Sequence, residues 1–314
     1  MVIITERDVN IFKILSSGAS DLADIRKMLR DVYKTDVSPN ALQKRLSLLK
    51  KDDYIRSRVY AKKNEGLRVK KEGYEQEESE KAMRSNVPFA LYALTFLSIA
   101  VLVERGYDHN WIRACLPGPP FIKHDEMVRE VVRAIKKEAA RVGYSFGLVD
   151  ELNLKRMASK YKSRENLPDL LVRLTLDIGS EQIVKRYNLE IDNNTISPLY
   201  MVDKVLKSKR RTIIICNDSK SRMESFLRAF KSAVKDEAKR NLIKRKQRKG
   251  NVQPLQQHED IPLAHKVVFT YIKEFCSRGF LQTNFISIDG EPVYIVPPEI
   301  NKKIIIRGRG VYDT

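Results

Sequence analysis

Cysteine is scarce in this 314-residue chain, and Cys115, Cys216 and Cys276 lie far apart with no CxxC pair among them. This spacing argues against a disulfide framework and against a zinc knuckle. The four histidines form no histidine–hydrophobe–histidine metal triplet, and the chain has neither a GxxxxGK[ST] loop nor a GxSxG elbow. The sequence therefore gives no support for ATP hydrolysis or for serine-hydrolase chemistry.

Long apolar runs are also lacking. Residues 87–103 are uncharged, but a membrane-spanning helix needs roughly 20 residues. The stretch also contains Tyr92, Thr95 and Ser98, and Pro88 stands near its start. We predict a buried core helix here, with a membrane span and a partner-binding helix as alternatives. The opening MVIITERD shows no signal peptide, so we expect a cytoplasmic, reduced protein without stable membrane insertion.

Positive charge is what the sequence has in excess. Lys and Arg number 59 against 40 Asp and Glu, which leaves a net charge of +19. Such a surplus repels itself in the folded state, and a polyanionic partner relieves that repulsion. Nucleic acid is the first expectation and an anionic membrane surface the second. The length predicts two or three domains, and we expect a multidomain α+β protein.

The first 80 residues read as a winged helix-turn-helix domain. Helix starts are predicted at Thr5 and at the Ser38–Pro39 pair, because both offer capping chemistry before an apolar periodic segment. A short second helix is predicted between them, from about Asp21 to Leu29. Residues 54–60 and 67–69 then read as the strands of a basic hairpin, or wing. In this layout the third helix enters the major groove of double-stranded DNA and the wing lies along the backbone.

Residue chemistry nominates the DNA contacts within this domain. Polar side chains that can read base edges lie on the third helix, and basic side chains for phosphates lie on the helix and the wing. The predicted contacts are Asn40, Gln43, Lys44, Arg45, Arg56, Arg58, Lys62, Lys63 and Arg68. The alternative is a winged helix that contacts protein, with these charges merely solvated.

Residues 81–123 read as a helical connector that ends in a Pro-rich turn at residues 117–120. Beyond it, periodicity predicts a helix over 125–142, strands over 145–149, 170–176 and 184–191, a helix over 197–208 and a strand over 211–216. This order predicts an antiparallel meander followed by a crossover helix and a fourth strand. The central α/β domain spans residues 124–250.

Three carboxylates stand at strand ends in this domain. Asp169 precedes one strand, and Glu190 and Asp192 end the next with their side chains on the same side. Hard carboxylate oxygens suit Mg²⁺ or Mn²⁺, which could activate water against a phosphodiester. Lys204 on the following helix, with Lys207 behind it, could neutralise the developing charge. The alternative is that these are ordinary turn residues.

The Pro168–Asp169 pair and the Glu190–Asp192 stretch resemble the PD-(D/E)xK nuclease superfamily, with its restriction-endonuclease-like core. The lysine position two after the glutamate holds Asp192 instead. In some branches the lysine lies on the next helix, which implicates Lys204. A first-helix glutamate in that superfamily implicates Glu130 or Glu126.

One branch is closer still. The winged helix, the His124–Asp125 helix start, the PD strand and the EIDNNT stretch over residues 190–195 resemble the replication-relaxation family, which includes MobC-type relaxases. The resemblance covers roughly residues 5–230. It implies a DNA-binding protein of plasmid or mobile-element mobilisation or replication, with Mg²⁺-dependent nicking at an origin. The alternatives are a non-catalytic DNA-binding regulator or replication accessory protein, and a membrane-associated assembly protein.

The last third of the chain begins with a long basic helix, predicted over residues 219–246. Its end predicts phosphate contacts by Lys244, Arg245 and Lys246, although a nuclear localisation signal would look the same. Residues 251–314 read as a small α+β module with a helix from Pro262 to Gly279 and a hairpin around Asp289–Gly290. We assign it no task. Expected partners are DNA, other replication or mobilisation proteins and a second copy in a homodimer.

Overall fold

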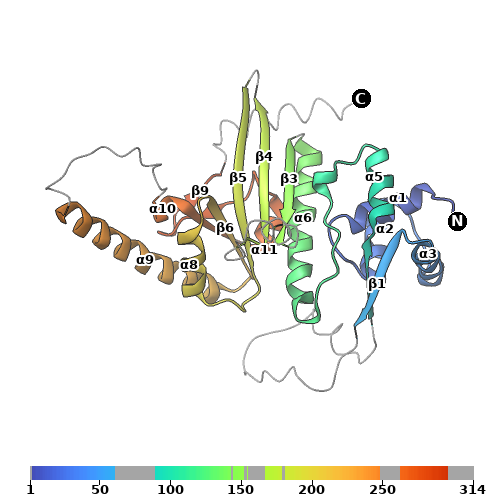
Figure 1. Cartoon of the computed structure of the whole chain (residues 1–314), viewed down its shortest axis with the longest axis horizontal. Coiled ribbons are helices and arrows are strands. Elements are labelled where there is room, and N and C mark those ends of the chain that lie inside the picture. Colours follow the sequence, from blue (N-terminus) through green and yellow to red (C-terminus); the bar gives the residue numbers. More distant parts are fainter. Residues whose placement is uncertain are drawn as a thin grey trace. The chain divides into compact units, whose positions relative to one another are not determined.

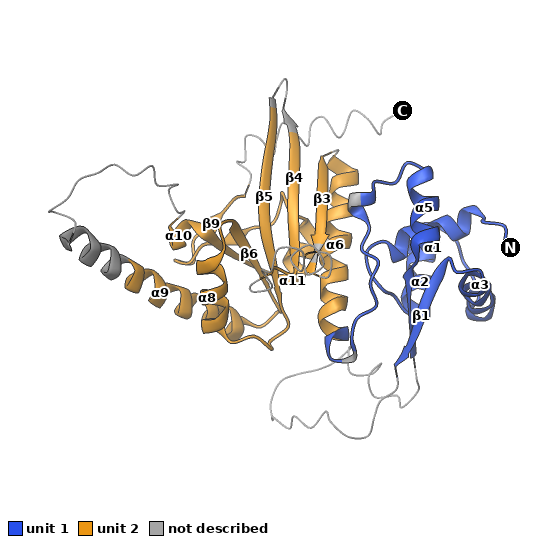
Figure 2. Cartoon of the chain, in the orientation of Figure 1, with its two compact units in different colours: residues 1–122 blue, residues 123–314 orange. Residues whose placement is uncertain are grey.

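The computed structural model describes residues 2–60, 89–142, 144–151, 154, 167–178, 181–247 and 262–295. The chain divides into two compact units, Met1–Ile122 and Lys123–Thr314 (Figure 2). Both mix helices with strands, so the expected α+β class is correct.

Three short helices open the first unit (Figure 1): α1 (Glu6–Leu15), α2 (Leu22–Asp31) and α3 (Pro39–Lys51). Helices α1 and α3 begin where their capping residues Thr5 and Ser38 predict, and α2 begins one residue after Asp21. Thr5 and Asp8 form a capping box on α1, Asp21 accepts the Asp24 N–H at 2.7 Å, and Ser38 accepts the Ala41 N–H at 3.3 Å. These bonds satisfy amide groups that a helix start otherwise leaves unpaired.

A two-stranded antiparallel sheet follows, made of β1 (Ile55–Tyr60) and β2 (Phe89–Leu94). A bridge between Ser20 and Tyr92, with N···O distances of 3.0 and 2.9 Å, attaches the α1–α2 loop to β2. The predicted partner strand over residues 67–69 lies outside the described residues. The strand that pairs with β1 comes instead from the segment predicted as a connector.

The prediction of one buried helix over 87–103 is therefore wrong. Residues Phe89–Leu94 form β2, and α5 (Phe96–Glu104) begins only after Thr95. Pairing with β1 satisfies the backbone of the first half, and Thr95 with Ser98 forms a capping box that starts the helix. Short 3₁₀ turns η1 (His109–Trp111) and η2 (Pro119–Phe121) complete the unit. Within the described parts of the chain, no helix has the length and apolar character needed to cross a bilayer.

The core of the first unit draws on its α-helices and on both strands. The apolar faces of α1, α2 and α3 converge with Ile55 of β1, Leu94 of β2 and Leu102 of α5. The fully buried members include Phe12, Leu15, Ile25, Leu29, Leu42, Leu46, Leu49, Ile55 and Leu102. The i, i+4 and i+7 spacing of Leu42, Leu46 and Leu49 leaves the opposite face of α3 to solvent.

The second unit starts with α6 (Ile122–Val142), whose first residue belongs to the other unit, and continues in the predicted order. The following elements are β3 (Ser145–Asp150), β4 (Leu170–Ile178), β5 (Glu181–Asp192), α8 (Pro198–Lys207), β6 (Arg211–Cys216) and α9 (Lys220–Gln247). Strands β3, β4 and β5 pair antiparallel, whereas β6 runs parallel to β5. Helix α8 makes this crossover.

The sheet then continues into the segment predicted as a separate C-terminal module. After α10 (Leu263–Lys266), β7 (Val267–Tyr271) pairs parallel with β6, and α11 (Ile272–Arg278) follows it. The single helix predicted from Pro262 to Gly279 is therefore wrong, because the β-branched and aromatic run VVFTY extends the sheet. The predicted turn at Gly290 (φ 97°) does connect β8 (Phe285–Ile286) to β9 (Pro292–Val293).

The result is a mixed seven-stranded sheet in the order β3-β4-β5-β6-β7-β8-β9. Helices α8 and α9 pack on each other and on one face of the sheet, where Phe226 and Phe230 of α9 contact Phe269 of β7. The carboxyl ends of β5 and β6 and the start of β4 meet at the same edge of this sheet. Asp169, Glu190 and Asp192 lie at that edge.

Candidate carboxylate centre and DNA-binding face

Asp169 and Glu190 lie side by side on neighbouring strands. Asp169 immediately precedes β4, whose first residue Leu170 pairs with Leu189 of β5. The Ile191 N–H donates to Asp169 Oδ2 at 2.7 Å, which ties this carboxylate to the backbone next to Glu190. The two carboxyl groups that the sequence nominates from separate segments are therefore neighbours.

Lys204 of α8 reaches the same place. Its Nζ donates to Glu190 Oε2 at 2.6 Å, and the Glu190 and Lys204 residues are only 2 % and 9 % exposed. Lys204 can reach β5 because α8 begins only six residues after that strand ends and returns along the sheet. Among the described residues, Glu190 Oε1 has no hydrogen-bond or ion-pair partner. Within the described part of the chain, Lys204 thus accounts for only one of the two Glu190 carboxylate oxygens.

His124 is a neighbour that the sequence did not single out for a role. It lies in the first turn of α6, and its Nε2 stands 3.2 Å from Asp169 Oδ1. A lone histidine at a helix start has no sequence signal that names its partner, since β3 and residues 151–169 separate α6 from β4 in the chain. Only the three-dimensional structure brings the two side chains together.

Burial and neighbouring charges separate the two carboxyl groups in acidity. Burial raises the pKa of Glu190 to about 8, and Asp169 adds to the rise while Lys204 opposes it. Burial also acts to raise the pKa of Asp169, but His124 and Lys204 outweigh it, so that pKa lies below its usual value. Burial acts to lower the pKa of Lys204, but Glu190 and Asp169 raise it overall. Asp169 is therefore the more readily ionised carboxyl group.

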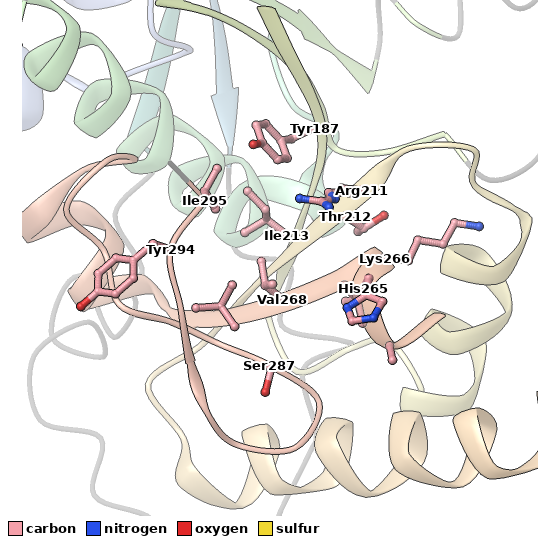
Figure 3. Close-up of a pocket in the computed structure, with 13 residues that line it drawn as sticks. Tyr187, Arg211, Thr212, Ile213, His265, Lys266, Val268, Ser287, Tyr294 and Ile295 are labelled. Carbon is pink, nitrogen blue, oxygen red and sulfur yellow. The ribbon is translucent and has the colours of Figure 1, made fainter. Parts of the chain in front are cut away.

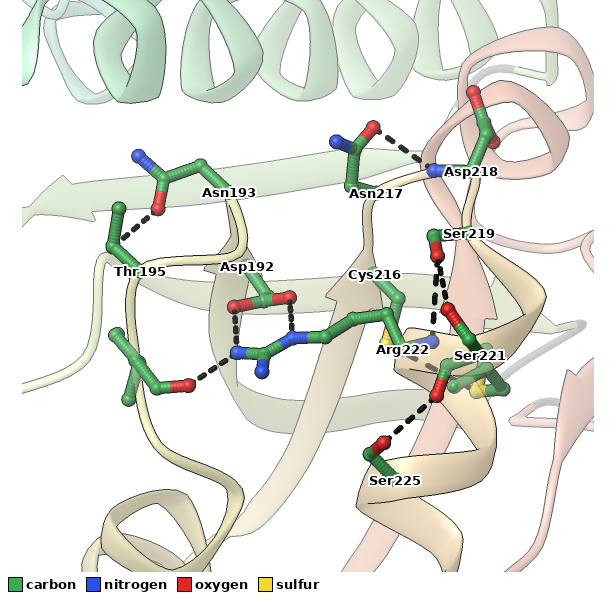
Figure 4. A network of polar contacts seen from close by, with 12 residues as sticks. Asp192, Asn193, Thr195, Cys216, Asn217, Asp218, Ser219, Ser221, Arg222 and Ser225 are labelled. Atoms are coloured by element: carbon green, nitrogen blue, oxygen red, sulfur yellow. Dashed lines mark hydrogen bonds and ion pairs between the residues drawn. The ribbon is translucent and has the colours of Figure 1, made fainter. Parts of the chain in front are cut away.

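Asp192, predicted as a metal ligand, has a different environment. Its fully buried carboxylate forms a bidentate pair with Arg222 of α9, with Nε–Oδ2 and Nη2–Oδ1 distances of 2.7 Å (Figure 4). Arg222 also donates to the Ile196 carbonyl and lies 4.5 Å from the Phe226 ring centroid. Both oxygens of Asp192 already accept hydrogen bonds from the Arg222 guanidinium, so this residue has a structural role that joins β5 to α9.

Two further residues predicted for the centre, Glu130 and Lys207, lie on solvent-exposed surfaces. Glu130 is about half exposed and pairs with Arg133 of its own helix at 2.9 Å. It makes no contact with Asp169, Glu190 or Lys204 among the contacts of the described residues. Lys207 pairs with Asp203 at 2.7 Å on the exposed side of α8. Glu126 is half-buried on α6.

Asp169 and Glu190 offer a partial set of ligands for a divalent cation. In the described part of the chain, no three His, Cys, Asp or Glu side chains cluster closely enough to enclose a metal. Magnesium, however, characteristically takes one or two carboxylates and fills its octahedron with water and substrate phosphate. Asp169 and Glu190, whose Oε1 has no partner in the part of the chain that the structure describes, match that partial set. The chemistry of the residues present therefore fits Mg²⁺ or Mn²⁺.

In the first unit, the predicted base-reading helix presents a polar face. Asn40, Gln43 and Lys44 are exposed on α3. Arg45 is not available in the same way, because its Nε donates to Asp8 Oδ1 at 2.8 Å and its Nη2 to the Ile3 carbonyl at 2.7 Å. The Asp8 carboxylate is fully buried. Arg45 therefore anchors α3 to α1.

The basic residues of β1 are exposed but partly occupied. Arg56 donates to the Ala114 carbonyl and Arg58 to the Pro117 carbonyl, each at 3.2 Å. Each guanidinium has further donors for phosphate oxygens. Lys62, Lys63 and Arg68 lie outside the described residues, as do the side chains of Lys244, Arg245 and Lys246.

A pocket of about 160 Å³ lies at the amino ends of β6 and β7 (Figure 3). The described residues that line it include Arg211, His265 and Lys266 and no acidic residue. Arg211 pairs with Tyr187 at the start of β6, whereas Asp192 pairs with Cys216 at its end. The pocket is therefore at the opposite end of these strands from Glu190 and contains no residue of the carboxylate centre.

Comparison with known proteins finds no matching family model, no matching curated protein and no matching solved structure. The likeness to the replication-relaxation family consequently rests on the sequence motifs alone.

Proposed function

We propose that this protein binds double-stranded DNA through its first unit and nicks it at a divalent-metal centre formed by Asp169, Glu190 and Lys204. One observation carries the proposal: the Lys204–Glu190 contact of 2.6 Å lies beside Asp169, and the three residues come from three separate segments. A chance occurrence of these residue types in the sequence would not require them to meet.

The order of elements supports the same proposal. A helix, three antiparallel strands, a crossover helix and a parallel strand are the succession that the PD-(D/E)xK resemblance implies. Three helices followed by a two-stranded antiparallel sheet likewise suit a winged helix. We infer a nuclease-like core joined to a DNA-binding domain, in a protein of plasmid mobilisation or replication.

Each residue of the centre would have a separate role in the proposed reaction. A divalent cation bound by Asp169 and Glu190 would supply an activated water and stabilise negative charge on the scissile phosphate. Lys204 places a buried positive charge beside Glu190, where it can orient the attacking water or offset charge on the phosphate. The exposed polar face of α3 and the arginines of β1 would hold the duplex.

The test is nicking of a supercoiled plasmid that carries the origin region of the replicon encoding this chain. The reaction is run with Mg²⁺, with Mn²⁺ and with EDTA. We expect metal-dependent nicking that Glu190→Gln abolishes while DNA binding persists. Asp203→Asn is the matched control, because Asp203 lies on the same helix as Lys204 but is exposed and paired with Lys207.

A second candidate function is DNA binding without cleavage. It is favoured by the contacts that already occupy the carboxylates: His124 and Ile191 hold Asp169, Lys204 holds one oxygen of Glu190, and Arg222 holds Asp192. Specific binding of origin DNA with no nicking under either metal would establish this alternative and exclude the nuclease.

A further inference from the structure

The contact between His124 and Asp169 joins the first turn of α6 to the start of β4. Nε2 and Oδ1 lie 3.2 Å apart, and the two side chains are only 19 % and 11 % exposed. An ionised carboxylate can only accept hydrogen bonds. The imidazole therefore donates from Nε2, and the pair is largely shielded from competing water.

Two donors from different elements fix the Asp169 carboxylate. The Ile191 N–H holds Oδ2 at 2.7 Å, and His124 holds Oδ1. The backbone donor alone would leave the carboxylate free to turn about that one bond. The second donor, His124, therefore fixes the orientation of the Asp169 carboxylate.

Each carboxylate oxygen still has a lone pair left after accepting one hydrogen bond. Held in this orientation, the Asp169 carboxylate keeps lone pairs for a cation next to Glu190, whose Oε1 has no partner among the described residues. Hydrogen bonds to ligating carboxylates commonly set ligand orientation in metal sites, and their loss typically weakens metal binding by about 10–100-fold.

We propose that His124 is a positioning residue for the metal centre, which holds the Asp169 carboxylate in its ligating orientation by the Nε2–Oδ1 hydrogen bond. The inference rests on the metal centre of the proposed function. It assigns His124 no direct contact with the cation or with DNA.

The experiment measures Mn²⁺ binding to the full chain without DNA, by titration calorimetry. His124→Gln keeps a donor near the position of Nε2 but removes the ring. His124→Phe keeps a ring of similar size but removes the donor. We expect the phenylalanine variant to bind Mn²⁺ about 10–100-fold more weakly than wild type and the glutamine variant to recover most of the affinity. His265→Ala, at an exposed position remote from the centre, should bind as wild type does.

Equal Mn²⁺ affinity in the phenylalanine and glutamine variants, or wild-type affinity in the phenylalanine variant, would overturn the positioning role while leaving the metal centre intact. Wild-type protein whose Mn²⁺ binding is absent, or is unaffected by Asp169→Ala, would instead refute the metal centre and the positioning role with it. Different results would therefore refute the positioning role of His124 alone or the metal centre as a whole.

Discussion

At the scale of single residues, the ion pair with Arg222 distinguishes Asp192, which has a structural role, from the proposed metal ligands Asp169 and Glu190. Both oxygens of the fully buried Asp192 are bonded to Arg222. Removing one partner of a buried pair typically costs about 3–5 kcal/mol, because the other charge stays buried and uncompensated. We expect Asp192→Asn to lower the free energy of unfolding by about 3 kcal/mol, measured by urea denaturation followed by circular dichroism.

The matched comparison for this prediction is Asp203→Asn, whose exposed i,i+4 pair with Lys207 contributes little to stability. A metal-binding role for Asp192 predicts the reverse pattern. If Asp192→Asn kept wild-type stability but lost Mn²⁺ affinity, the structural role would be refuted.

The pair between Asp8 and Arg45 makes the stability of the first unit depend on pH. Burial acts to raise the pKa of Asp8, but hydrogen bonds from Arg45 and Thr5 outweigh it, so the pKa lies below 3.8. Well above pH 3.8 the Asp8 carboxylate is ionised in both the folded and the unfolded chain, and the ion pair contributes fully to the free energy of unfolding. As pH falls through the lowered pKa the folded chain takes up the proton late, and that stability is lost.

We therefore expect Asp8→Asn to be less stable than wild type at pH 7, with a difference that shrinks as the pH falls through the folded pKa. The single tryptophan, Trp111, lies in the first unit, so its fluorescence in denaturant reports this transition. Asp36→Asn is the control, since Asp36 is 78 % exposed and 3.9 Å from Arg26. A stability difference independent of pH would argue against the ion pair as its cause.

At the scale of elements, the buried Glu138 of α6 holds the turn that follows α11. It accepts N–H groups of Phe280 and Leu281, the latter at 2.9 Å, and the Tyr144 hydroxyl at 2.9 Å. This close approach needs Gly279, which has φ 82° and whose added Cβ would stand 2.5 Å from Glu138 Cδ. A side chain there would both strain the backbone and push the carboxylate off its donors.

Gly279→Ala should therefore destabilise the second unit by about 3 kcal/mol or more, since a strained φ alone costs about 1–3 kcal/mol. Gly290→Ala is the matched control, because Gly290 also has a positive φ (97°) but an added Cβ meets nothing within 4 Å. The difference between the two thermal midpoints isolates the Glu138 contact. Equal losses would mean that backbone strain alone decides.

The exposed face of α3 is the surface that the proposed function assigns to DNA. Lys44 is exposed on this helix, whereas Arg45, its neighbour in sequence, is bound to Asp8. We expect Lys44→Ala to weaken DNA binding uniformly across sequences and to reduce the salt slope of binding by about 1. Arg45→Ala should mainly lower the stability of the first unit. Fluorescence anisotropy with labelled duplexes measures the first effect, and an unchanged affinity in Lys44→Ala would exclude this helix face.

The sequence predicted some helices and strands correctly and others wrongly. Capping residues and helical periodicity located α1, α2, α3, α8 and α9 because these signals are local. Local signals failed at residues 89–94 and 267–271, which became strands through pairing with β1 and β6 from distant segments. In the centre, residue type nominated Asp169, Glu190 and Lys204. The contacts of His124 and Arg222 depend on tertiary packing and could not be predicted from spacing.

At the scale of the whole molecule, the net charge of +19 is the property that most directly bears on a nucleic-acid partner. Binding that neutralises phosphates releases condensed counterions, so the logarithm of affinity falls linearly with the logarithm of salt concentration. A protein with 6–10 phosphate contacts loses roughly 10³–10⁵-fold in affinity between 50 and 200 mM salt. We expect a loss in this range for duplex DNA, measured by anisotropy over that interval. A loss of less than about tenfold would mean that the positive charge is only solvated, and the DNA-binding proposal would then have to rest on base contacts alone.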